Sequence, residues 1–353
     1  MLQYREKQYR IEDVLPGMTL GEDIGHNSGK SILNQGAVLT EKLIQRLENW
    51  HIAHVVIREV VEPTKENRSQ ALEKQKDFKH NYGETVQIIK QIFDSTKACK
   101  DIPIKDLREL AQTKVKPFLN ESGLLNNLYL IERNDNYLYQ HSLDVAIIGG
   151  TLANWLALPY QEVEDIILAG LLHDIGKVLV PDEILDKRGR LTPEEMEAVM
   201  LHSLYGSKLI KKLKYVSAKV NIAVLQHHER ADGSGYPLKA TCANIYLPAK
   251  VIAIADVYDA ITSNRIYQER VSPFEAVATL EDMMGKLDIS VCMTFLNNIK
   301  ECFIGNNVLL SDGRNAKVIY WAKFKHALPI VQTQEGECIS LEQEKLSIVD
   351  VIH

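Results

Sequence analysis

The feature that most constrains this chain is a set of metal-binding side-chain types within otherwise apolar helical stretches. One cluster is the eleven-residue run HHERADGSGYP, from His227 to Pro237, and another is HDIGK, from His173 to Lys177. An imidazole or a carboxylate in an apolar interior is costly unless it is hydrogen-bonded or coordinated. The chain must therefore fold so that these groups satisfy one another, which indicates a metal site.

Composition bounds the class of protein. The chain has 353 residues, 45% of them hydrophobic, which is enough for more than one domain with a packed core. Lys and Arg total 41 against 47 Asp and Glu, and this net charge of -6 argues against a general nucleic-acid-binding protein. The five cysteines are widely spaced without a CxxC pair, so we expect reduced thiols rather than disulfides. Without an apolar signal core or an apolar run of roughly 20 residues, we expect a soluble, cytoplasmic protein with no membrane span.

The pattern along the chain predicts a mainly α fold in four segments. Residues 1–61 are predicted to form a small N-terminal α+β accessory module, with a helix that opens at Thr40 and a strand near residues 53–57. Residues 62–125 are predicted to be a helical connector that transmits movement or pairs two copies. Residues 126–302 are almost entirely helical in pattern and hold the candidate chemistry. Residues 303–353 are predicted to be a small C-terminal β extension, because Asp312-Gly313 between two apolar runs predicts a hairpin.

Helical spacing directs the candidate ligands inward. Thr192-Pro193-Glu194-Glu195 is a capping box, so a helix starts there, and His202 lies on its apolar face. The stretch 166–172 is apolar all round, which is typical of a buried helix, and it ends at His173 and Asp174. Asp256 follows the apolar run 251–255. Each of these polar groups therefore emerges from a core.

The number of donors favours two ions over one. A single ion with open positions needs fewer than seven donors, whereas two ions bridged by one carboxylate would use them all, with Asp174 as the natural bridge. Imidazoles and carboxylates without thiolates suit Fe, Mn or Zn. A close metal pair can clamp both oxygens of an in-line phosphoryl displacement. The predicted metal ligands are His141, His173, Asp174, His202, His227, His228 and Asp256.

These motifs give the chain a family resemblance. The HDxGK form at His173–Lys177 and the HHExxDGxGYP form at His227–Pro237 resemble the HD-GYP phosphodiesterases, a branch of the HD superfamily of helical metal-dependent phosphohydrolases. The resemblance covers about residues 126–302, and residues 14–41 look like the module often attached to such domains. It implies a helical HD-type bundle that hydrolyses cyclic di-GMP to pGpG or GMP, usually with iron or manganese. Some members prefer hybrid cyclic dinucleotides.

The resemblance also implies roles for single residues. All seven predicted donors match the family's metal ligands, and Lys177 and Arg265 match groups that contact phosphate. Arg265 can face the site only if its helix ends near Ser263. The loop Gly235-Tyr236-Pro237 matches one that is implicated in contacts with diguanylate cyclase (GGDEF) partners, and we also expect it at the substrate. We expect Glu229 and Asp232 to orient metal ligands rather than to bind metal.

The chain departs from the family pattern at two positions. Gln268 stands where relatives often have a second basic residue, so that one phosphate contact is weakened or is replaced by Arg270. Tyr137 stands where members with a third metal carry glutamate, so we expect two metals.

The main functional hypothesis is a cyclic di-GMP phosphodiesterase in which a hydroxide activated by two metals attacks phosphorus, with Asp174 and Lys177 as catalytic residues. The alternatives are a non-catalytic cyclic-dinucleotide receptor, a phosphodiesterase for hybrid dinucleotides, and a mononucleotide phosphohydrolase. The sequence leaves open the native metal, the end product, the preferred dinucleotide, the signal sensed by residues 1–61 and whether two copies form a homodimer.

Overall fold

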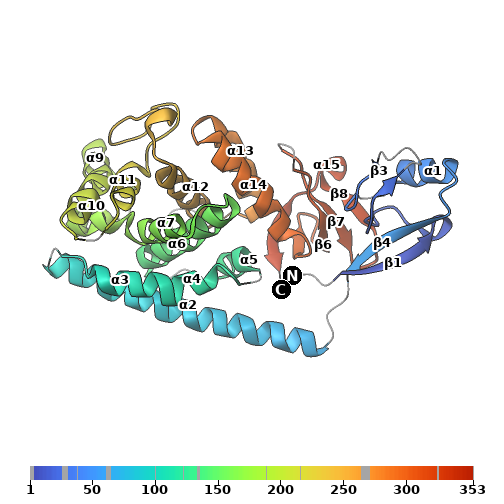
Figure 1. Ribbon diagram of the computed structural model, residues 1–353, viewed down its shortest axis with the longest axis horizontal. Coiled ribbons are helices and arrows are strands. Elements are labelled where there is room, and N and C mark those ends of the chain that lie inside the picture. The colour runs from blue at the N-terminus through green and yellow to red at the C-terminus, as the bar shows by residue number, and fades with distance from the viewer. Residues whose placement is uncertain are drawn as a thin grey trace. The chain divides into compact units, whose positions relative to one another are not determined.

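Figure 1 shows the computed structural model of the chain. It describes residues 4–25, 31–37, 39–60, 65–99, 101–121, 123–132, 136–187, 189–214, 216–263, 271–323 and 326–352. Within these ranges strands occur only up to residue 60 and from residue 307 onward, and everything between them is helix or loop. The predicted mainly α fold with a small N-terminal α+β module and a short C-terminal β extension is confirmed.

The chain forms two compact units. Unit 1 consists of Met1–Glu73 and Phe303–His353, and unit 2 consists of Lys74–Cys302. The predicted boundary after residue 302 coincides with a unit boundary. Most of the predicted connector, residues 62–125, belongs to unit 2, which begins at Lys74.

Unit 2 is a helical bundle. Its elements are α2 (Lys65–Cys99, which begins in unit 1), α3 (Ile104–Leu110), the π-helix η2 (Ala111–Val115), α4 (Lys116–Phe118), α5 (Leu124–Tyr129), α6 (Tyr137–Trp155), α7 (Tyr160–Leu172), η3 (Ile175–Leu179), α8 (Asp182–Leu185), α9 (Pro193–Met200), α10 (His202–Lys211), α11 (Ala218–Gln226), η4 (Cys242–Asn244), α12 (Leu247–Thr262), α13 (Pro273–Asp282), η5 (Met283–Gly285) and α14 (Ile289–Phe303).

The centre of the bundle is formed by α6, α7 and α12 (Figure 1). Every residue of α6 from Gln140 to Ala153 is buried, polar side chains included. Helix α7 lies so close to α6 that a Cβ at Gly170 would be 2.5 Å from the Cα atom of Ala146. Burial on all sides over these residues explains why the sequence of α6 shows no polar face.

Helix α2 packs on this bundle through one apolar side. Phe78, Tyr82, Val86 and Phe93 are buried, and the Tyr82 hydroxyl donates a hydrogen bond of 2.9 Å to Oδ1 of Asp144 on α6. Helix α2 is therefore a packed layer of the helical bundle of unit 2.

The helix that starts at Thr192 is shorter than the sequence indicates. The capping box is confirmed, since the Thr192 hydroxyl accepts from the backbone N–H of Glu195 and the Glu195 carboxylate accepts from the backbone N–H of Thr192. However, α9 ends at Met200, and His202 is the first residue of the separate helix α10.

Unit 1 contains two small β-structures. In the N-terminal part, β1 (Tyr4–Arg10) pairs antiparallel with β4 (His54–Val60). The helix predicted at Thr40 is confirmed, because the Thr40 side chain caps it at the N–H of Leu43. The remaining N-terminal elements are η1 (Ile11–Asp13), β2 (Ile24–Gly25), β3 (Ser31–Leu33) and α1 (Glu41–Asn49).

The C-terminal part is a five-stranded antiparallel sheet in the order β8-β7-β6-β5-β9. The predicted hairpin at Asp312-Gly313 is confirmed, and Gly313 has the positive φ of 88° that such a turn favours. Its elements are β5 (Asn307–Leu310), β6 (Asn315–Tyr320), β7 (Ile330–Thr333), β8 (Cys338–Ser340), α15 (Leu341–Glu344) and β9 (Ile348–Ile352).

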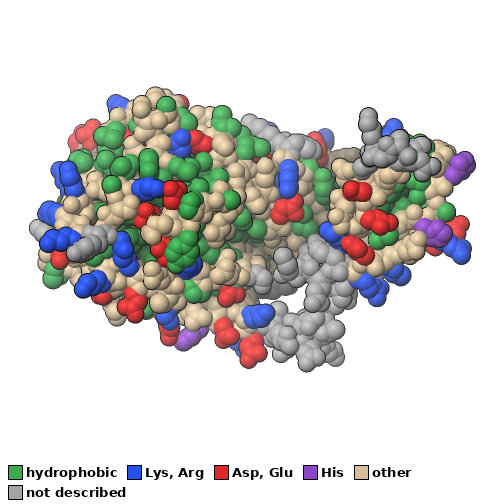
Figure 2. All heavy atoms as spheres, viewed as in Figure 1, with side chains coloured by type: hydrophobic (Ala, Val, Ile, Leu, Met, Phe, Trp, Pro, Cys, Tyr) green, Lys and Arg blue, Asp and Glu red, His purple; other side chains and the backbone are tan. Residues whose placement is uncertain are grey.

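The described surface shows mixed charge on the face drawn in Figure 2. Lys and Arg side chains are interspersed with Asp and Glu among the coloured residues. Among the helices in the described ranges, none combines the length and the apolar character needed to cross a membrane.

A close contact between η3 and α10 fixes the position of the HDIGK motif. A Cβ at Gly176 would overlap the His202 carbonyl group and lie 2.5 Å from the Gly206 nitrogen. Only a glycine permits this approach, and the approach holds Asp174, just before η3, beside His202.

We therefore expect Gly176→Ala to lower the free energy of unfolding by about 1–3 kcal/mol, because the added methyl group must push η3 from α10. Gly83→Ala on α2 is the matched control, since a Cβ there meets nothing within 4 Å. It should be neutral or stabilising by about 0.5–1 kcal/mol. Urea unfolding of both variants checks this, and equal stability of the two variants would contradict the proposed contact.

Candidate metal centre

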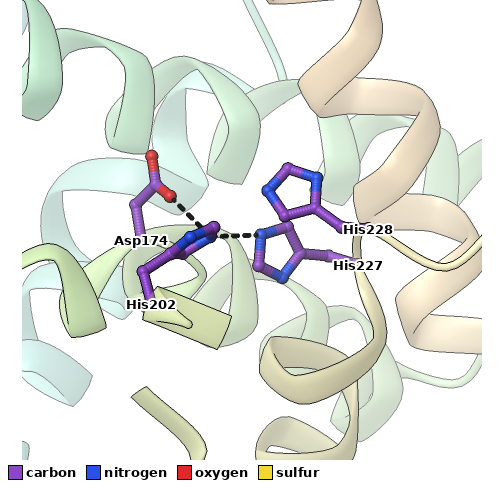
Figure 3. A group of neighbouring side chains, drawn as sticks. All are labelled: Asp174, His202, His227 and His228. Carbon is purple, nitrogen blue, oxygen red and sulfur yellow. Dashed lines mark hydrogen bonds and ion pairs between the residues drawn. The ribbon is translucent and has the colours of Figure 1, made fainter. Parts of the chain in front are cut away.

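Five helix ends or faces bring the predicted ligands together. His141 lies on α6, His173 and Asp174 follow α7, His202 begins α10, His227 and His228 follow α11, and Asp256 lies on α12. They form two groups, and within each group one potential donor atom per residue lies within 4.8 Å of the others. The first group is His141, His173 and Asp256, and the second, drawn in Figure 3, is Asp174, His202, His227 and His228.

The Asp174 carboxylate faces both groups. Its Oδ1 lies 3.3 Å from Nε2 of His202 in the second group, and its Oδ2 lies 3.4 Å from Nε2 of His173 in the first (Figure 3 shows the contact with His202). Asp256 has a similar position, with Oδ1 3.2 Å from Nε2 of His141 and Oδ2 3.7 Å from Nδ1 of His228. Two buried carboxylates therefore connect the two groups.

Hydrogen bonds at Nδ1 orient the imidazoles. In His173, His202 and His227, Nδ1 lies 2.7 Å from the carbonyl oxygen three residues earlier in the chain. A carbonyl oxygen only accepts, so each Nδ1 carries the proton and donates it. In the neutral ring the lone pair is then on Nε2, the atom that points into the site.

The distances between these Nε2 atoms fit metal ligation. His141 and His173 place their Nε2 atoms 3.2 Å apart, and His202 and His227 place theirs 3.3 Å apart. Two lone pairs at such a distance repel each other unless a proton or a metal cation lies between them. Two nitrogens bound to one ion at about 2.1 Å are separated by about 3.0–3.4 Å for right-angle to tetrahedral arrangements. The residues present therefore fit two metal ions.

The electrostatics of the side chains also favour cations. Burial raises the pKa of Asp174, but the charges of Lys177 and His173 outweigh it and hold that pKa well below its ordinary value. Burial likewise opposes ionisation of Asp256, and the hydrogen bond from His141 again prevails, so its pKa is well below the ordinary value. Both carboxylates are therefore negative at neutral pH.

The histidines differ in their protonation. Burial lowers the pKa of His202, lowers that of His227 strongly and lowers that of His228 to about 3, which keeps these rings neutral. Burial also lowers the pKa of His141, but hydrogen bonds with Asp256 and Asp259 outweigh it and raise the pKa to about 9. Without a metal ion, a protonated His141 partly balances the negative charge of the two carboxylates. A bound metal ion would take the place of the proton on Nε2 of His141.

Lys177 lies at the edge of the site. Its Nζ donates a hydrogen bond of 2.6 Å to Oδ2 of Asp174, and 24% of its side chain is exposed. The predicted phosphate-binding Arg265 lies outside the described residues, as do Gln268 and Arg270. Helix α12 ends at Thr262, so the expected helix end near Ser263 is confirmed.

The loop after His228 is held by its own side chains. The buried Glu229 carboxylate accepts from the backbone N–H of Leu238 at 2.6 Å and of Ala240 at 2.8 Å. Asp232 is exposed and accepts from the N–H and hydroxyl of Ser234. In the described structure the hydrogen bonds of both carboxylates go to groups of the loop itself, and not to the imidazoles that we expected them to orient.

The loop Gly235-Tyr236-Pro237 covers one side of the second group. The Tyr236 ring lies over His228 with the ring centroids 4.7 Å apart, and it contacts His202 edge-on. Burial raises the Tyr236 pKa, and the charges of Asp174 and Asp256 add to this, so the phenol stays neutral. A Cβ at Gly235 would lie 2.4 Å from both the Arg230 nitrogen and the His228 oxygen, so this glycine permits a tight turn.

His141 makes two contacts that were not predicted from the sequence. Nδ1 of His141 lies 2.7 Å from Oδ2 of the buried Asp259, and the ring of Tyr137 stacks on the imidazole with an interplanar angle of 9°. The signal for Asp259 was available, because it lies three residues after Asp256 on the same apolar helix. Tyr137 occupies the position where we expected no third-metal ligand, and its ring packs on His141.

Comparison with known proteins agrees with this geometry. Residues 127–291 match the HD domain family. Over 201 residues the chain is 39% identical to a cyclic di-GMP phosphodiesterase of Pseudomonas aeruginosa, a match that covers 57% of this chain and 49% of that protein. Over 191 residues it is 35% identical to a 3'3'-cGAMP-specific phosphodiesterase of Vibrio cholerae, covering 54% and 44%. The chain thus spans about half the length of these curated relatives.

A solved structure shows the same fold. An HDG"Y"P protein from Bdellovibrio bacteriovorus matches with a TM-score of 0.52 at 17% sequence identity, and the match covers 84% of this chain and 100% of that one. Residues 127–291 therefore form an HD domain, and the fold of the chain is similar to that of this solved structure.

Proposed function

We propose that the chain is a metal-dependent phosphodiesterase that hydrolyses cyclic di-GMP to pGpG or GMP, with two divalent ions, iron or manganese in preference to zinc. The observation that carries this proposal is the position of Asp174, whose two carboxylate oxygens face separate groups of donors at 3.3 and 3.4 Å. A carboxylate shared between two ions would hold them close enough to act on one phosphate, as in hydrolases with two metal ions.

The ions would supply Lewis-acid activation of a water molecule and neutralisation of charge on the phosphate. The residues of the chain would orient the ligand atoms and balance the charge. His173, His202 and His227 are oriented by their Nδ1–H bonds to backbone carbonyls, so each offers Nε2 in a fixed direction. Asp174 and Asp256 offset the positive charge, and Tyr236 shields His228 from water.

Lys177 is suited to bind the phosphate. It is partly exposed and pairs with Asp174 at the edge of the site, where its ammonium group would be within reach of a phosphate. A cation aimed at the phosphate stabilises the negative charge that grows there in the transition state. Arg265 would add a second such cation.

The relatives support two substrate classes. Their names include cyclic di-GMP phosphodiesterases and 3'3'-cGAMP-specific ones, so a hybrid dinucleotide is the second candidate substrate. Contacts of residues 235–237 with a diguanylate cyclase, pairing of two copies and a cytoplasmic location stay predictions implied by the sequence.

The substrate assignment is tested with protein loaded separately with Fe, Mn and Zn. We expect cyclic di-GMP to be converted to linear pGpG or GMP, followed by chromatography, with iron or manganese the more active. Faster turnover of 3'3'-cGAMP would favour the hybrid substrate. Tight binding of both dinucleotides without turnover would favour the receptor and contradict the proposed activity.

Asp174→Ala tests the shared carboxylate. Its removal takes a ligand from both groups, so we expect metal content to fall from two ions per chain and turnover to fall with it by at least about 100-fold. Asp165→Ala, which changes a carboxylate on α7 outside the two groups, is the control and should keep both ions. Elemental analysis beside initial rates would contradict the proposal if Asp174→Ala kept two ions and near-normal hydrolysis.

Lys177→Ala separates charge at the phosphate from metal binding. We expect the variant to keep two ions but to lose about 100-fold in kcat/KM, because it lacks a cation at the developing charge. Lys177→Arg keeps the charge and should lose less. A variant Lys177→Ala with normal kcat/KM would show that the lysine only pairs with Asp174.

A further inference from the structure

The two groups of the metal centre differ in how their histidines are supported. His173, His202 and His227 each donate from Nδ1 to a neutral carbonyl three residues earlier in the chain. His141 instead has a carboxylate at Nδ1, with Asp259 Oδ2 at 2.7 Å. Both side chains of this pair are almost fully buried.

The Asp259 carboxylate is itself held in place. Its Oδ1 accepts a hydrogen bond of 3.0 Å from the Ser263 hydroxyl, one turn later at the end of α12. Asp256, one turn earlier on the same helix, has Oδ1 3.2 Å from Nε2 of His141. The two carboxylates of α12 therefore lie at opposite nitrogens of one imidazole. Asp256 lies at Nε2, on the side of the metal centre, and Asp259 lies at Nδ1, on the far side of the ring.

A carboxylate behind a ligand histidine has two physical effects. It fixes the Nδ1–H tautomer and the ring orientation, and it pushes electron density toward Nε2, which makes the imidazole a stronger donor. A neutral carbonyl has the first effect and little of the second. Of the four metal-centre histidines described with a hydrogen bond at Nδ1, His141 is the one whose acceptor is a carboxylate. Nδ1 of His228 lies 3.7 Å from Oδ2 of Asp256, which is too far for a hydrogen bond.

We propose that Asp259 is a positioning residue that makes the two halves of the centre unequal, by strengthening His141 as a ligand for the ion in the His141–His173–Asp256 group. The proposal rests on the metal centre of the proposed function. Asp259 would touch neither substrate nor ion, and would act through His141 alone. Ser263 would support it by holding the carboxylate.

The test is Mn²⁺ binding to the full chain after chelation, with free Mn²⁺ counted by its electron paramagnetic resonance signal. Wild-type protein should bind two ions. In Asp259→Asn one binding step should weaken about 10–100-fold while the other stays unchanged. Ser263→Ala should weaken the same step by a smaller factor.

Thr262→Val is the matched control. It removes a buried hydroxyl from the same turn of α12, one that donates to the Tyr258 carbonyl and not to the site. Both binding steps should stay at the wild-type values. If this control weakened binding as Asp259→Asn does, the effect would be one of helix stability, and the inference would be wrong.

A spectroscopic readout separates positioning from stability. In Zn²⁺-loaded protein with labelled histidines, the Nδ1 proton of His141 should resonate far downfield, as a proton shared with a buried carboxylate does, and Asp259→Asn should shift it upfield. The Nδ1 protons of His173, His202 and His227 should keep their positions.

The outcomes distinguish this inference from the proposed function. If wild-type protein bound fewer than two ions, the proposed centre would be wrong, and the inference with it. If wild-type protein bound two ions and Asp259→Asn did so with the same affinities and the same His141 resonance, only the inference would be overturned. Equal weakening of both steps would also overturn it, because Asp259 is hydrogen-bonded to His141, a member of the first group.

Discussion

The buried carboxylate of Asp174 is the group on which the arrangement of unit 2 depends. It is 1% exposed and remains ionised, and a charge in such a place is tolerated only if it is paired. Its oxygens face His202 on one side and His173 on the other, while Lys177 donates to it from the edge. The helices that carry these residues must therefore meet at one point.

Two features of the bundle bring these residues together: the places where helices end, and the close packing of η3 on α10. His173 follows the last residue of α7, and His227 follows the last residue of α11, so both imidazoles leave apolar helices and enter the site. Each imidazole donates a hydrogen bond from Nδ1 to a backbone carbonyl of the helix that precedes it, so no other side chain is needed to orient the ring. Glycine at 176 allows η3 to approach α10 until the Asp174 carboxylate lies beside His202. The geometry of the site is thus a consequence of how the core packs.

Much of this was accessible from sequence because buried polar groups are rare and need partners. That argument predicted seven donors, which the structure brings together in two groups. The Thr192 capping box correctly predicted the start of α9, and the apolar run before His173 correctly predicted a buried helix, α7. The same argument could have found Asp259, which lies on a helix that is apolar at almost every other position.

Other features could not be predicted because they depend on tertiary contacts. No glycine or proline marks the break between α9 and α10. At this break, Nδ1 of His202 donates a hydrogen bond to the carbonyl oxygen of Val199 in the last turn of α9. The packing of α2 on α6 is fixed by contacts such as Tyr82 to Asp144, 62 residues apart in the chain. The roles of Glu229 and Asp232 in their own loop depend on a turn whose path the residue types alone do not determine.

The central claim is that one carboxylate joins two ions, and anomalous diffraction from crystals of the Mn²⁺-loaded chain tests it most directly. The account predicts two anomalous peaks about 3.5–4 Å apart, the spacing of two-metal hydrolases, with one Asp174 oxygen near each peak. One peak would belong with His141 and His173, and the other with His202 and His227. A single peak, or two peaks without Asp174 between them, would contradict the account.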